Sequence, residues 1–238
     1  ALGSGAMGVA LTTGTDNVAI GENALDAVVS GTDNTAVGDN AAGAVSTGTD
    51  NTAVGSGALL LEDTGTFNTA VGSSALGALN YDGAGYNTAV GYGAGSTLTT
   101  GTNNTFLGGY DGNESSLDLR TSSNNIVLSD GAGVPRLVVN SSGQTGIGVI
   151  APASLLDVGG TVQVGVDGTG YDVKFFGATS GAYMLWDESA DDLILAGAAG
   201  LSVAGASTLT GNTTVGGTLG VSSTTTITTA VDQAFPLT

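Results

Sequence analysis

The octet GTDNTAVG occupies residues 31–38 and recurs without change at residues 48–55. A catalytic site is made once, because its residues must converge on one reacting centre, whereas a repeated octet indicates a backbone unit that stacks on its own copies. Successive copies begin 17, 17, 17, 19 and 17 residues apart. The related copies are GTDNVAIG from Gly14, GTFNTAVG from Gly65, AGYNTAVG from Ala84 and GTNNTFLG from Gly101.

One unit contains the alternation of a short strand. In NTAVG, Asn34 and Ala36 are expected on one side of the strand, and Thr35 and Val37 on the other. Gly38 then permits the chain to turn. A second short strand is expected around an alanine that recurs at the same spacing, at Ala24, Ala41, Ala58, Ala75 and Ala94. Residues 1–113 are therefore predicted to form a parallel β-roll or β-solenoid with rungs of about 17 residues.

Two residue types should form ladders along this roll, about 4.8 Å apart. Stacked side-chain amides can hydrogen-bond to one another and to turn carbonyls, so we interpret the asparagines as structural rather than as a binding face. The glycines mark the matching turn, and no strand-to-helix context suits them to phosphate binding. The asparagines are Asn17, Asn34, Asn51, Asn68, Asn87 and Asn104. The glycines are Gly21, Gly38, Gly55, Gly72, Gly91 and Gly108.

Composition agrees with a thin, repetitive β-structure. Glycine makes up 42 of 238 residues, proline only three, and aromatic residues 5%. The net charge of −18 disfavours nucleic acid and anionic lipid as direct partners. The absence of Cys and His excludes thiol catalysis, Cys or His zinc sites and Ser-His-Asp triads. No apolar run is long enough to insert into a membrane, and no cofactor is expected.

Both faces of the predicted strand are uncharged, and a single roll buries only the inner one. The outer face, lined by Thr, Val or Ile, therefore needs a partner. A symmetric assembly of identical chains supplies one most simply. The stretch ALGSGAMG at the start of the chain looks like the end of an earlier unit, so we expect the encoded protein to extend further toward the N-terminus.

The units resemble two families. GTDNVAIG, GTDNTAVG and GTFNTAVG are similar to the head repeats of trimeric autotransporter adhesins, and this resemblance implies a left-handed parallel β-roll in a homotrimer. GTNNTFLGGYDGN followed by NNIVLSDGAG is similar to fibre proteins of tailed bacteriophages. The resemblance over residues 1–113 concerns the architecture more than the host surface recognised.

Residues 124–164 strengthen the resemblance to phage fibre and neck-appendage proteins. In those proteins a similar segment often ends in GIGTTSPSSKLDV and leads to a C-terminal chaperone domain, whereas this chain has VIAPASL and shows no such domain. The residues themselves predict strands at NIVLSD, RLVVNS, TGIGV, LLDVGG and TVQVGV.

The chain is divided on this basis into four parts. After the repeats, residues 114–165 are a β-strand connector and residues 166–195 a small β-domain or hairpin with the only Trp and Lys. Residues 196–238 are a Gly- and Thr-rich stem of fibrous β segments. The predicted fold class is all-β, in an intertwined homotrimer.

Two minor site hypotheses stay open beside the structural one. Asp16, Asp33 and Asp50 recur in register and repel one another unless solvent, a neighbouring chain or Ca²⁺ relieves them, and a solvated acidic ridge is the favoured interpretation. A glycosidase pair beside a sugar-stacking aromatic is the second hypothesis. It would draw on Asp187, Glu188, Asp191 and Asp192 near Tyr183 and Trp186, but a solvated turn between two strands is favoured.

Three function classes remain at this stage. The favoured one is a phage virion structural protein on the particle surface, a trimeric fibre that contacts other virion proteins and a host glycan or protein, and is not an enzyme. The head of a bacterial surface adhesin would predict a coiled-coil stalk and an anchor, and residues 114–238 show neither. A polysaccharide-cleaving spike ranks third.

Overall fold

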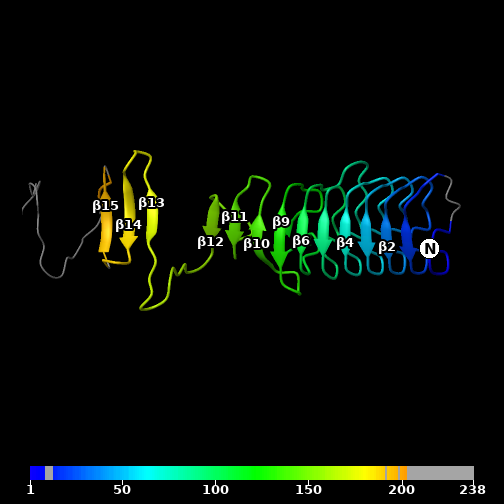
Figure 1. Cartoon of the computed structure of the whole chain (residues 1–238), viewed down its shortest axis with the longest axis horizontal. Helices are drawn as coiled ribbons and strands as arrows, with labels where there is room; N and C mark the ends of the chain where they lie inside the picture. Colours follow the sequence, from blue (N-terminus) through cyan, green and yellow to red (C-terminus); the bar gives the residue numbers. More distant parts are fainter. Residues whose placement is uncertain (9–12, 191, 198, 203–238) are drawn as a thin grey trace, which may run out of the picture. The chain divides into compact units, whose positions relative to one another are not determined.

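The computed structural model describes residues 1–8, 13–190, 192–197 and 199–202. These residues form an all-β structure without a helix. The chain divides between Val162 and Gln163 into two units, and each is described by itself. The first unit is a parallel β-solenoid of about seven turns that continues into a short antiparallel region (Figure 1).

Each regular turn of the solenoid contributes one strand of three residues. Neighbouring strands pair in parallel, with equivalent residues in register, so that Ala36 lies beside Ala53 and Ala53 beside Ala70. The predicted solenoid is thereby confirmed. The strands are β1 (Val18–Ile20), β2 (Thr35–Val37), β3 (Thr52–Val54), β4 (Thr69–Val71), β5 (Thr88–Val90) and β6 (Thr105–Leu107).

The predicted sidedness of the strands is also correct. Asn34 and Ala36 are fully buried inside the turn, whereas Thr35 and Val37 are only half-buried on the outer face. The interior is narrow because each strand directs only a small alanine inward, at Ala19, Ala36, Ala53, Ala70 and Ala89. At β6 the inward residue becomes Phe106, whose ring meets Tyr110 edge-on at 5.5 Å. The larger aromatic side chains therefore fill the solenoid only toward its last turns.

The second strand expected in each rung does not form. The segment around Ala41 is a series of turns, in which Asn40 and Ala42 have left-handed φ angles of 54° and 49°. Ala41 and Ala42 are both buried, whereas a strand would direct successive residues to opposite faces. The segment still pairs with the next rung, because Ala42 N–H donates to the carbonyl of Ala58 at 2.8 Å. Each rung thus has one strand and one turn-rich arm.

After β6 the sheet continues but changes direction. β9 pairs in parallel with β6, β10 and β11 pair antiparallel, and β12 lies parallel to β11. Four of the five strands predicted for residues 124–164 are present, but TVQVGV forms no strand, and its valines at 162 and 164 are exposed. The bounds are β7 (Asn113–Glu114), β8 (Leu117–Asp118), β9 (Ile126–Ser129), β10 (Pro135–Val139), β11 (Thr145–Ile147) and β12 (Leu156–Val158).

The second unit contains a three-stranded antiparallel sheet in the order β13-β14-β15. Its strands are β13 (Val173–Phe176), β14 (Tyr183–Asp187) and β15 (Asp192–Ala196). The stem predicted for residues 196–238 lies almost wholly outside the described residues.

Candidate functional site

The side-chain amides of the ladder asparagines form hydrogen bonds inside the solenoid. Asn34 Nδ2 donates to the carbonyl of Gly48 at 2.8 Å, and its Oδ1 accepts the backbone N–H of Asn51 at 3.0 Å. The same pattern repeats at Asn51, which bonds to Gly65 and Asn68. These side chains are buried and already hydrogen-bonded, so the geometry supports a structural role for the ladder.

A seventh asparagine extends the ladder beyond the six that the repeat predicts. Asn125 is 2% exposed, and its backbone N–H donates to Oδ1 of Asn104 at 3.0 Å. The spacing widens to 21 residues because the β7–β8 hairpin is inserted between them. The sequence signal was an asparagine directly before the apolar alternation of NIVLS, but it fell outside the 17-residue period.

The predicted turn glycines stack against one another. Gly55 has a φ of +133°, and a Cβ added there would lie 2.5 Å from the carbonyl carbon and oxygen of Gly72. The other five glycines have φ between +107° and +140°, and a Cβ added at each would meet the backbone of the next rung. Conformation and close packing therefore both require glycine at this corner.

The predicted acidic ridge lies on the surface, at the corner just before each strand. Asp16, Asp33 and Asp50 are in or near the left-handed region, with φ of 60°, 60° and 57°. Asp16 and Asp50 lie in successive turns on either side of Asp33, so the register of the strands stacks the three positions. Among the described residues, no group of three His, Cys, Asp or Glu side chains could hold a metal ion.

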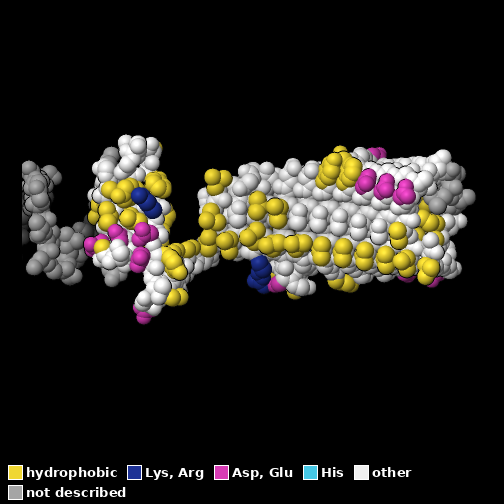
Figure 2. Space-filling view, in the orientation of Figure 1, with side chains coloured by type: hydrophobic (Ala, Val, Ile, Leu, Met, Phe, Trp, Pro, Cys, Tyr) yellow, Lys and Arg dark blue, Asp and Glu magenta, His cyan; other side chains and the backbone are white. Residues whose placement is uncertain are grey.

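The same corner carries aromatic residues in the next two turns. Phe67 and Tyr86 are 43% and 55% exposed, and their rings stack with centroids 5.0 Å apart and planes 3° from parallel. Figure 2 shows one edge of the solenoid on which a row of acidic side chains gives way to a hydrophobic patch. Phe67 and Tyr86 hold the octet position at which Asp50 stands in the preceding turn, and no aromatic stack was predicted there.

A buried carboxylate lies one turn away from this stack. Glu62 is fully buried, and its Oε1 and Oε2 accept the backbone N–H groups of Gly65 at 2.8 Å and Tyr81 at 3.4 Å. Burial raises the pKa of Glu62, and these backbone hydrogen bonds act in the opposite direction. Glu62 therefore hydrogen-bonds to both the start and the end of the turn that follows it.

The outer face of the solenoid carries a continuous apolar stripe. One Val, Ile or Leu from each strand lies in register with the next, and the row of hydrophobic side chains runs along the solenoid in Figure 2. Ile20 is 44% exposed and Leu107 39%, although both are large and apolar. The stripe consists of Ile20, Val37, Val54, Val71, Val90, Leu107 and Leu128.

The sheet of the second unit also has an uncovered apolar face. Alternation and strand register put six apolar residues on one side, and Phe175 and Leu193 are 58% and 60% exposed. On the opposite side, Lys174 Nζ lies 3.6 Å from the ring centroid of Tyr183. The apolar face consists of Val173, Phe175, Met184, Trp186, Leu193 and Leu195.

The acidic group considered for glycoside hydrolysis is partly occupied in shaping a turn. Asp187 Oδ1 accepts hydrogen bonds from Ser189 and Ala190, and the Ser189 bond lowers the pKa of Asp187. Trp186 and Glu188 line an open pocket of about 640 Å³ together with residues 166–170. Asp192 pairs with Asp187 at the end of the hairpin, while residue 191 lies outside the described residues.

Comparisons with known proteins identify no relative of this chain. No protein-family model, curated protein or solved structure matches the chain. The described residues also contain no helix long and apolar enough to cross a membrane.

Proposed function

We propose that the protein is a structural component of a bacteriophage virion, a trimeric fibre that forms a rigid shaft for attachment to the host surface. The proposal draws on the resemblance of the repeats and of residues 124–164 to phage fibre and appendage proteins. The parallel β-solenoid agrees with it, because stacked rungs give an extended and rigid unit.

The observation that carries the proposal is the apolar stripe on the outer strand face. A line of large apolar side chains along the whole sheet is unfavourable in water, and it is straight and periodic enough to fit an identical line on another chain. The apolar face of the β13–β15 sheet needs a cover for the same reason. Three copies around one axis would bury the stripe.

The alternative is the head of a bacterial trimeric surface adhesin, because its repeats share the same unit. An adhesin head would trimerise through the same stripe. The oligomeric state therefore cannot distinguish it from a phage fibre, but the location of the protein can. The minor alternative, a polysaccharide-cleaving spike, is favoured only by Trp186 and Glu188 sharing an open pocket.

The first experiment is the molar mass of the purified chain in solution, by light scattering on a size-exclusion column. A trimer of a 22.8 kDa chain has a mass of about 68 kDa. A mass of 22.8 kDa would show that the stripe remains solvated and would end the trimer proposal.

A second experiment addresses location. Mass spectrometry of density-purified tailed phage particles should detect this chain among the virion proteins. Its recovery from bacterial outer-membrane fractions, with none in the particles, would favour the adhesin instead.

A further inference from the structure

The 17-residue spacing of the octets is interrupted at one place, between residues 62 and 86. Glu62 occupies the buried position that other turns fill with Val45 or Leu79. The turn that follows is longer, since the octets from Gly65 and Ala84 begin 19 residues apart. The interruption therefore combines a lengthened turn with a buried carboxylate that accepts hydrogen bonds from Gly65 at the start of that turn and from Tyr81 near its end.

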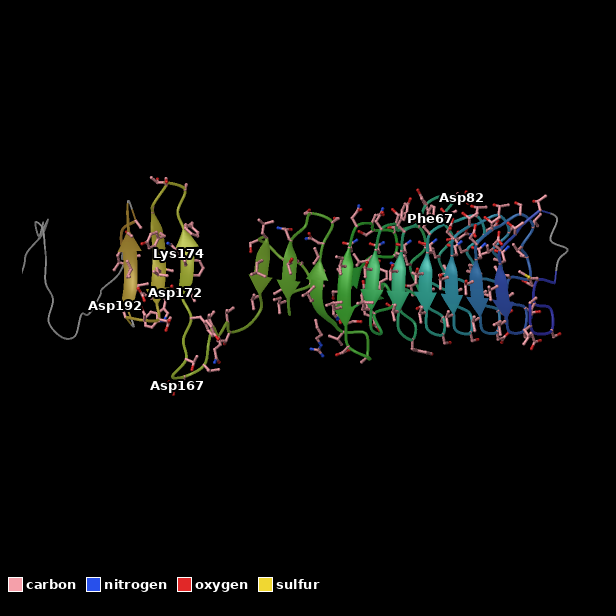
Figure 3. The ribbon with its side chains drawn as sticks, in the orientation of Figure 1. Phe67, Asp82, Asp167, Asp172, Lys174 and Asp192 are labelled. Carbon is pink, nitrogen blue, oxygen red and sulfur yellow. The ribbon has the colours of Figure 1, made fainter. Side chains whose placement is uncertain are left out.

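The insertion also alters the asparagine ladder locally. Asn68 Nδ2 donates to the carbonyl of Thr66 in its own turn at 3.3 Å, whereas Asn51 and Asn87 on either side of it donate to a glycine of the next turn. The inserted loop places Asp82 on the surface, where its carboxylate accepts a hydrogen bond from Thr64 Oγ1 at 2.6 Å. Figure 3 shows Phe67 and Asp82 on the same edge of the solenoid.

The aromatic residues occupy a position whose backbone disfavours them. Phe67 and Tyr86 have φ of 61° and 50°, a left-handed conformation that Asp and Asn tolerate and that bulky side chains avoid. Adjacent turns follow this preference with Asp50 and Asn103 at the same position. Two consecutive aromatics are thus present at this exposed corner in spite of the local conformational preference.

The stack offers flat binding surfaces. Because the two rings are nearly parallel and cover each other, each keeps one ring face that is not covered by its partner. The register places Asp50 in the turn before Phe67 and Asn103 in the turn after Tyr86. Carboxylate and amide groups beside these exposed aromatic side chains match a sugar, whose C–H face stacks on an aromatic ring while its hydroxyl groups hydrogen-bond.

We propose that Phe67 and Tyr86 form a binding platform for a neutral glycan. Neutral pyranose rings are favoured over acidic sugars because the exposed charged groups around the platform, Asp50, Asp63 and Asp82, are all carboxylates. The chain as a whole carries −18, which would repel uronic or sialic acid residues. The inference rests on the proposed attachment function and names the surface that would perform it.

The test measures binding of soluble glycans to the full chain by saturation-transfer difference NMR and titration. The probes are maltoheptaose, cellohexaose, chitohexaose and yeast mannan, with polygalacturonate and polysialic acid as acidic counterparts. Two variants, Phe67→Asn and Tyr86→Asn, introduce a residue that this corner already carries at Asn103 and suits its backbone. We expect at least one neutral probe to bind and each variant to bind it about tenfold more weakly.

The matched control is Tyr92→Ser, because Tyr92 is an 81% exposed aromatic outside the stack, at a position where other turns have Ser56 and Ser73. It should bind as the wild type does. The platform is disproved if no neutral probe binds, if acidic probes bind equally well, or if the asparagine variants keep full affinity. The mass of each variant is measured in parallel, so a trimer that binds no glycan would leave the fibre proposal standing and remove only this inference.

Discussion

Asn51 connects three turns of the solenoid through its backbone and its side chain. Its amide donates to the carbonyl of Gly65, and its Oδ1 accepts the N–H of Asn68. Replacement by alanine would leave both backbone groups buried without this partner. We expect Asn51→Ala to lower the free energy of unfolding by about 3 kcal/mol per chain, measured by thermal unfolding followed by circular dichroism.

The control for this change is Asn80→Ala, since Asn80 is exposed and belongs to no ladder. Its effect should stay within about 0.5 kcal/mol. Equal melting temperatures for the two variants would show that the ladder contributes no more than a surface amide.

Glu62 should make stability depend on pH in a defined direction. Burial raises its folded pKa above the ordinary value of 4.5, so the folded state holds the proton more tightly than the unfolded state. This contribution is present below pH 4.5 and is lost as the pH rises through the folded pKa. Glu62→Gln keeps an oxygen for Gly65 N–H but carries no charge.

We therefore expect Glu62→Gln to gain stability relative to wild type as the pH increases from 4 to 8. The comparison of the two melting curves removes the effect of the other carboxylates, which titrate equally in both proteins. A difference in melting temperature that stays constant over this range would show that Glu62 has no raised pKa.

The repeat was sufficient to predict the buried ladder, because six asparagines recur with the strand. Glu62 could not be singled out in the same way. In LLEDTG a glutamate suggests a solvated turn, and only the structural equivalence with Val45 and Leu79 reveals a buried site. The aromatic stack escaped prediction because Phe67 and Tyr86 are 19 residues apart, and their contact depends on how the inserted loop is accommodated.

At the scale of one turn, two neighbouring glycines differ in what they tolerate. A Cβ on Gly55 would lie 2.5 Å from the backbone of Gly72, whereas a Cβ on Gly57 would meet only Ser74 Oγ at 3.9 Å. Gly57 has a φ of +65°, close to the 54° of Asn40, which holds the same position one turn earlier. Gly55 therefore tests the effect of a steric clash, and Gly57 tests the effect of the left-handed backbone conformation.

We expect Gly55→Ala to destabilise the chain by about 3 kcal/mol or to prevent folding, because the rungs must separate to admit a methyl group. Gly57→Asn should change stability by no more than about 0.5 kcal/mol. Urea unfolding of both variants measures the difference. A tolerated Gly55→Ala would mean that the stacked corners are looser than the structure indicates.

The prediction of a second strand in each rung was wrong because it overlooked pairs of adjacent apolar residues. Ala58 and Leu59 are adjacent and both buried, which a strand cannot arrange. The left-handed φ of 50° at Leu59 allows both to point inward. The strands from β1 to β6 were predictable because alternation is local, whereas the conformation of the arm depends on backbone pairing between turns.

At the scale of the whole molecule, assembly is the property that a single chain leaves open. The outer stripe was expected from the uncharged face of the strand, and the structure shows its exposure. What covers it stays a prediction. An isolated solenoid folds around its own alanines and asparagines, so charges added to the stripe should leave each chain folded and affect only the contact between chains.

The double variant Val71→Asp/Val90→Asp tests this separation. Both residues lie on the stripe, and Val90 is 39% exposed. In a trimer the variant would bring six carboxylates together, at an energetic cost that burial cannot offset. We expect the mass in solution to fall from about 68 to 22.8 kDa while the β-sheet circular dichroism remains. Ser56→Asp is the control, because it copies Asp39 of the preceding turn and should stay trimeric. A double variant that keeps the wild-type mass would place the contact between chains on another face, and the solvated stripe would then need a different explanation.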